Sequence, residues 1–276
     1  MKTSTSKTSI LLVIFFSLIS PMTGANGQNQ LEKQLLIESL YVDSQMTKRV
    51  TFMINNKKKH LSDGLISFYQ EKTEEGIKLK PIEESQKKIT SNINQHMTVD
   101  AIRLEFTGIL QDELTLKELK SLFKWFSSST GKKFLNDELN SVLSGGASDQ
   151  LMAANAGHPQ PSQESLRSAQ QLIKVMGDND SFVRDLALDF QNSFQVILQE
   201  FPQVDQQLPP IDKMTKVMGA VMIPAYTQKL ALRLQLMNPQ QKNELLSFAK
   251  SSPALKKFYA AMSQSYINVI QRMVNK

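Results

Sequence analysis

Amphipathic helical periodicity, repeated along most of the chain, is the feature that most constrains its fold. The clearest stretch begins at Thr115, because Thr115 and Glu118 have the spacing of a helix capping box. Apolar residues then recur at helical steps, at Leu119, Leu122, Phe123 and Phe126. Only 11 glycines and 10 prolines occur in 276 residues, which is few for an all-β fold with many turns. The sequence therefore predicts an all-α protein.

The N-terminus has the three-part pattern of a secretory signal peptide. Lys2 and Lys7 supply positive charge, residues 10–19 form an apolar run, and small residues lead up to Ala25. That run is too short to cross a bilayer, which needs roughly 20 residues. We predict cleavage after Ala25, no transmembrane span in the mature chain, and a periplasmic or secreted location.

Charge and cysteine content exclude several classes of protein. The formal net charge is +6, and Lys2 and Lys7 in the predicted signal peptide carry two of those charges. The remaining excess is mild and not concentrated, so we predict no nucleic-acid binding. The chain has no cysteine, which excludes disulfides, thiolate metal sites and cysteine catalysis.

A change of composition divides the mature chain. Residues 144–165 contain Ser144-Gly145-Gly146, Gly157, Pro159 and Pro161, a composition typical of a linker. We predict a signal peptide over 1–25, a first helical module over 26–143, a linker over 144–165 and a second helical module over 166–276.

The two predicted modules share an ordered set of features. Asn238, Pro239 and Gln241 resemble the cap at Thr115, and an offset of 123 places Trp125 opposite Phe248. Upstream, Leu36-Ile37 and Leu172-Ile173 open apolar helices at an offset of 136. Chance likeness between amphipathic helices is the alternative. Duplication of one module explains the ordered set better.

One string carries a family resemblance. Residues 114–119 (LTLKEL), followed by Phe123, Trp125-Phe126 and Gly131-Lys132-Lys133-Phe134, resemble the domain-of-unknown-function family 2059. The resemblance implies a helical protein exported by Gram-negative bacteria, and it implies no activity. A second copy would depart from the pattern, since Asn238-Pro239 replaces Leu-Thr and Ala254 stands in place of the glycine.

No catalytic constellation can be read from the sequence. His60, His96 and His158 lie in separate segments, and the common zinc, calcium and nucleotide motifs are absent. We therefore expect no metal and no cofactor. The acidic pairs and the basic run Lys57-Lys58-Lys59-His60 read as solvated surface, and we expect the basic run to be the last turn of a helix.

Two features suggest binding. Phe123 and Trp125 with Lys132 and Lys133 are a candidate partner surface, because Trp125 falls off the apolar stripe; inter-helix core is the alternative. The 13 methionines also bear on binding, since methionine-rich grooves accept varied apolar ligands.

We predict a non-enzymatic periplasmic or envelope binding module whose partner is an envelope protein or an apolar ligand. The first alternative is an envelope hydrolase that uses dispersed carboxylates. A second is a protein secreted toward a host. A structure with two buried acids in one cleft would favour the hydrolase.

Overall fold

The computed structural model describes residues 25–143, 160–176 and 179–275, and these ranges are helical without strands. The prediction of an all-α fold is confirmed. The predicted signal peptide lies outside the described residues except for Ala25, and so do residues 144–159 of the predicted linker. The first six helices are α2 (Ala25–Asp43), α3 (Met46–Glu74), α4 (Ile82–His96), α5 (Val99–Glu113), α6 (Leu116–Ser127) and α7 (Ser129–Leu143).

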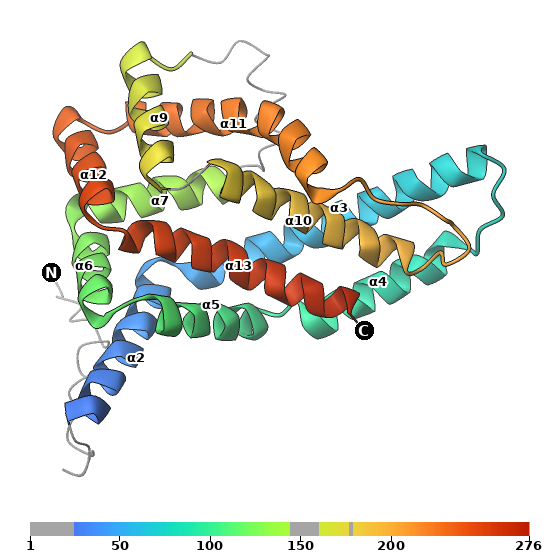
Figure 1. The fold of residues 1–276 in the computed structure, drawn as a ribbon, viewed down its shortest axis with the longest axis horizontal. Coiled ribbons are helices and arrows are strands. Elements are labelled where there is room, and N and C mark those ends of the chain that lie inside the picture. The colour runs from blue at the N-terminus through green and yellow to red at the C-terminus, as the bar shows by residue number, and fades with distance from the viewer. Residues whose placement is uncertain (1–24, 144–159, 177–178, 276) are drawn as a thin grey trace, which may run out of the picture.

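Five described helices follow residues 144–159, and the first of them begins inside the predicted linker. They are α9 (Gln163–Met176), α10 (Asn179–Leu198), α11 (Ile211–Gln235), α12 (Pro239–Ser251) and α13 (Ala254–Val274). In Figure 1, α3 and α4 form a hairpin that projects from one end of the molecule, and α2 extends from the other.

Both predicted helix caps are confirmed. The Thr115 hydroxyl accepts from the Glu118 amide at 3.2 Å, and the Glu118 carboxylate accepts from the Thr115 amide at 2.8 Å. Asn238 and Gln241 make the same reciprocal pair at 2.8 and 3.1 Å. Each pair satisfies two amides that a helix N-terminus would otherwise leave without partners.

The expected helix end at Lys57 to His60 is wrong. Helix α3 continues for 29 residues without interruption, and the Lys57 side chain is only 7% exposed. The reason is tertiary, since α10 packs against this face of α3 and supplies an acid for the lysine. Only Lys59 and His60 of the basic run are exposed.

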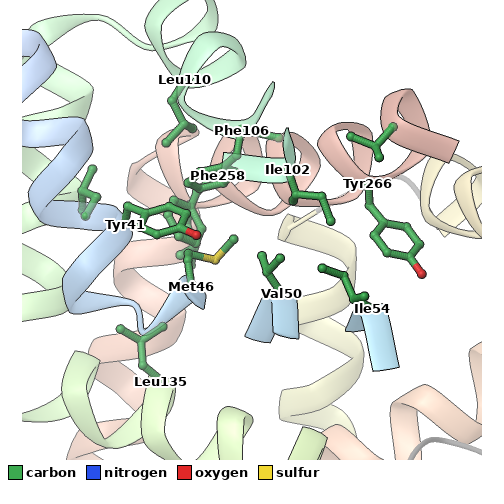
Figure 2. Close-up of a cluster of buried hydrophobic side chains, with 14 of the residues drawn as sticks. Tyr41, Met46, Val50, Ile54, Ile102, Phe106, Leu110, Leu135, Phe258 and Tyr266 are labelled. Carbon is green, nitrogen blue, oxygen red and sulfur yellow. The ribbon is translucent and has the colours of Figure 1, made fainter. Parts of the chain in front are cut away.

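The helices before and after residues 144–159 share one hydrophobic core. Helix α13 runs beside α5 (Figure 1) and also packs on α4, α6 and α10. Figure 2 shows Phe258 of α13 against Phe106 of α5, with Tyr41 and Met46 close by. The Phe258 and Phe106 rings meet edge to face, with centroids 5.3 Å apart. Burial of apolar surface therefore ties the two halves together.

Gly131 occupies a position where a side chain has no room. A Cβ built there lies 2.0 Å from the carbonyl oxygen of Trp125, whereas a Cβ at Gly108 in α5 meets nothing within 4 Å. The glycine in the Gly131-Lys132-Lys133-Phe134 string therefore permits the close approach of α7 to the end of α6.

These two glycines make a matched pair of predictions. Gly131→Ala should lower the free energy of unfolding by about 1–3 kcal/mol, because the backbone must move to relieve the overlap. Gly108→Ala should raise it by about 0.5–1 kcal/mol, since alanine favours a helix interior. Urea denaturation followed by far-UV circular dichroism measures both. Equal midpoints for the two variants would contradict the close approach at Gly131.

Candidate functional site

A cavity of about 470 Å³ lies among α3, α7, α9, α10, α11 and α13. Leu172, Ile173 and Met176 line it from α9, and Ile223 and Leu230 line it from α11. The volume falls within the range of about 300–1,000 Å³ typical of small-molecule pockets, which are also mostly apolar with a few polar groups. The chain therefore has a space that an apolar molecule can enter.

The mouth of the cavity can be located from the lining residues that reach solvent. His60 of α3, Lys256 and Ala260 of α13 and Tyr226 of α11 all line the cavity and are all exposed. The cavity thus opens between α3, α11 and α13, and its floor lies at the buried residues Leu172 and Leu230.

A lysine–aspartate pair joins α3 to α10 at the cavity wall. The Lys57 ammonium lies 2.8 and 2.6 Å from the two carboxylate oxygens of Asp189, and it donates to the Ser193 hydroxyl at 2.8 Å. Its three donors are therefore all used. The same ammonium lies 5.6 Å from the centre of the Tyr266 ring, a distance at which a cation is attracted to an aromatic face.

A second charged group joins α3, α7 and α13. The Arg49 guanidinium lies 3.0 Å from the Glu138 carboxylate, with the two side chains 5% and 13% exposed. The Tyr259 hydroxyl donates to the same carboxylate at 2.7 Å. Burial and then the negative charge of Glu138 raise the pKa of Tyr259 well above its ordinary value, so Tyr259 stays a neutral donor.

The third acid in the cavity forms no ion pair with any described residue. Asp185 of α10 accepts a hydrogen bond from the Ser263 hydroxyl at 2.8 Å, and no ion pair to it is found among the described residues. Burial raises the pKa of Asp185, against the smaller lowering effects of Ser263 and of the charge on Arg184. Among the carboxylates that line this cavity, Asp185 is thus the one without an ion pair in the described part of the chain.

The four residues of the predicted partner surface lie away from this cavity. Trp125 is 8% exposed and stacks on Phe248 of α12, with ring centroids 4.7 Å apart, so its ring lies between helices. Phe123 is half-buried against the core. Lys132 is exposed, and Lys133 donates to Asp137 at 2.8 Å. A partner surface at this end of the molecule stays a prediction.

The sequence offered weak signals for the cavity. Lys57 and Asp189 are 132 positions apart, so no local pattern could pair them. Met53 of α3 lines the cavity, and methionine was the one residue type that the sequence linked to apolar ligands. Asp185 and Asp189 lie one turn apart on α10, on either side of the lining residue Leu186. Acids interrupting an apolar stripe were the signal that could have found the site.

In the described ranges, no cluster of three or more metal-ligating side chains is found, and none of the helices combines the length and hydropathy that a membrane crossing requires.

Comparisons with known proteins bear on one part of the chain. No match was found among curated proteins or among solved structures. Residues 100–155, a segment that begins in α5 and contains α6 and α7, match the model of the domain-of-unknown-function family 2059, described as an uncharacterized protein conserved in bacteria, and the match confirms the resemblance read from the motif.

Proposed function

We propose that this protein is an exported, non-catalytic binding protein that holds an apolar small molecule in the cavity between α3, α9, α10, α11 and α13. The observation that carries the proposal is the cavity itself, about 470 Å³ with apolar walls and an opening to the surface. Protein interiors are normally packed with few voids larger than a water molecule. A lined and open space of this size therefore favours a ligand.

Export is part of the proposal and rests on the sequence. The positively charged start, the apolar run over 10–19 and the small residues before Ala25 are typical of a cleaved signal. Fractionation of cells tests it. Mature protein beginning at Asn26 in the periplasm supports retention, the same protein in the culture medium supports secretion toward a host, and uncleaved protein in the cytoplasm contradicts export.

We further propose that the two halves are duplicated modules packed about a pseudo-twofold axis. In such an arrangement equivalent residues meet at the axis, and other contacts occur twice with exchanged partners. Trp125 stacks on its counterpart Phe248 at an offset of 123, and Lys57 bonds to Ser193 at an offset of 136. These are the two offsets that align the halves of the sequence.

Exchanged contacts support the same axis. Glu118 of α6 pairs with Lys257 of α13 at 2.8 Å. In the reverse sense, Glu244 of α12 accepts from Thr130 of α7. Helix α12 is the counterpart of α6 in this alignment, and α13 is the counterpart of α7. Helix α6 therefore contacts α13, and its counterpart α12 contacts α7, the counterpart of α13.

The proposed duplication gives a reason for the cavity. Helix α13 packs closely along α5, where Phe106 and Phe258 fill the space. The corresponding pair, α7 and α11, meets through Arg233, whose guanidinium lies 5.0 Å from the centre of the Phe134 ring. One of two equivalent spaces is filled by aromatic side chains and the other is open, which favours specialisation of the open one for a ligand.

Filling the mouth of the cavity tests the binding function. Ala260 lines the cavity and is exposed, so Ala260→Trp should block entry without disturbing the core. We expect the purified protein to bind the neutral apolar dye N-phenyl-1-naphthylamine saturably, and Ala260→Trp to weaken binding by roughly tenfold or more.

The matched control is Ala220→Trp, at an exposed position of α11 that does not line the cavity. It should bind the dye as the parent protein does. Absence of saturable binding by the parent, or equal binding by the Ala260→Trp variant, would refute the proposed function.

A specific observation also bears on the hydrolase alternative, because three carboxylates line this one cavity. Hydrolysis of a glycosidic bond needs two of them, an acid and a base or nucleophile. Glu138 is held by Arg49, and Asp189 is held by Lys57, which leaves only Asp185 for proton transfer. Binding is therefore favoured over hydrolysis. Turnover of a glycan substrate that disappears in Asp185→Asn would reverse this choice.

A further inference from the structure

The three carboxylates that line the cavity differ in whether they form an ion pair. Its walls contain three carboxylates, at Glu138, Asp185 and Asp189. Arg49 neutralises Glu138, and Lys57 neutralises Asp189. Asp185 therefore leaves one negative charge in the cavity that no cation of the described chain compensates by an ion pair.

Only one oxygen of the Asp185 carboxylate has a hydrogen-bond partner among the described residues. Its Oδ2 atom accepts from Ser263, and no hydrogen bond to Oδ1 is found in the described part of the chain. Arg184, the neighbouring residue, is exposed and makes no ion pair with it there. A carboxylate with a free oxygen in an apolar surrounding attracts a cation more strongly than it would in water.

Two tyrosines lie on the helix face that carries Ser263, the hydrogen-bond partner of this carboxylate. Tyr259 and Tyr266 both line the cavity, and they stand four residues before and three residues after Ser263 on α13, so the three share one helix face. The cavity wall already places a cation over a ring, with Lys57 above Tyr266. A cavity lined by a carboxylate without an ion pair and by tyrosine rings is a good site for an ammonium group.

The basic side chains that line the cavity are less available to an anionic ligand. All three donors of Lys57 are occupied by Asp189 and Ser193. Lys256 and His60 lie at the exposed mouth, where solvent screens their charge. The deeper wall is apolar, with Leu172 and Ile173 of α9 and Leu230 of α11.

We propose that the cavity binds a cationic amphiphile, an amine that carries an apolar chain, with its ammonium group at Asp185, beside the face of α13 that carries Tyr259 and Tyr266, and its chain along α9 and α11. This assignment rests on the proposed binding function and names the class of ligand for it.

Competition against the neutral dye tests the assignment with three compounds of equal chain length: decylamine, decanol and decanoate. We expect decylamine to displace the dye at roughly tenfold lower concentration than decanol, with decanoate the weakest. Asp185→Asn keeps the size of the side chain and removes its charge. In that variant, with each concentration referred to the variant's own affinity for the dye, decylamine should fall to the level of decanol.

Asp63→Asn is the matched control, because Asp63 is exposed on α3 and does not line the cavity. It should keep the order of the three compounds. Failure of the dye to bind the parent protein would refute the binding function itself. Dye binding with decanoate equal to or stronger than decylamine, or an unchanged preference in Asp185→Asn, would overturn the assignment of a cation and leave the binding function intact.

Discussion

Replacing Lys57 with methionine is expected to lower the free energy of unfolding by about 3 kcal/mol. The substitution keeps the length of the side chain but removes the charge that lies 2.6 and 2.8 Å from the Asp189 carboxylate. Breaking a buried ion pair by removing one partner costs about 3–5 kcal/mol. We expect the lower end of this range because the Asp189 side chain is 24% exposed and can recover some hydration.

Two further variants separate the lost pair from lost packing. Lys59→Met changes an exposed lysine two positions away on the same helix and should change stability by less than about 0.5 kcal/mol. Lys57→Met combined with Asp189→Leu removes both charges and should recover more than half of the loss. Thermal and urea unfolding measure all three. Similar midpoints for Lys57→Met and Lys59→Met would show that the pair contributes nothing.

The parts of the fold that could be predicted are those encoded within a few residues. The capping boxes at Thr115 and Asn238 are confirmed because each depends on two side chains three positions apart and on the local backbone. The all-α class is confirmed for a similar reason, since one buried face per helix leaves a period in the sequence.

The burial of a helix on more than one face could not be predicted from neighbouring residues in the sequence. Trp125 falls off the apolar stripe of α6, yet it is buried because α12 brings Phe248 onto it. Lys57 stands in a basic run that looks solvated, yet α10 covers it and supplies Asp189. In both cases the covering residue comes from more than 100 positions away, so no window along the chain contains the information.

The cavity was hidden for another physical reason. Its apolar lining residues, such as Leu172 and Leu230, have the same pattern as residues of a filled core. Whether such residues meet or leave a space depends on how far apart the helices are held. That separation follows from packing elsewhere, and here the contact between α7 and α11 is made through Arg233 and Phe134.

Phe258→Ala is expected to lower the free energy of unfolding by about 3–5 kcal/mol, as large-to-small substitutions of buried aromatic residues do. Phe258 is 2% exposed, and its ring meets Phe106 at 5.3 Å and Phe126 at 5.0 Å, edge to face in both cases. The substitution leaves a void where α13 packs against α5 and α6. The loss should therefore destabilise the helices on both sides of residues 144–159.

The same variant distinguishes a shared core from two independent modules. Trp125, the single tryptophan, stacks on Phe248 and therefore reports by fluorescence on the contact between α6 and α12, while far-UV circular dichroism reports on all helices. With a shared core, Phe258→Ala shifts both transitions together to lower denaturant. Leu104→Ala, at a side chain 70% exposed on α5, should shift neither by more than about 0.5 kcal/mol. A fluorescence transition that moves to lower denaturant while part of the circular dichroism transition stays in place would mean that the two halves unfold separately, and that Phe258 stabilises only its own.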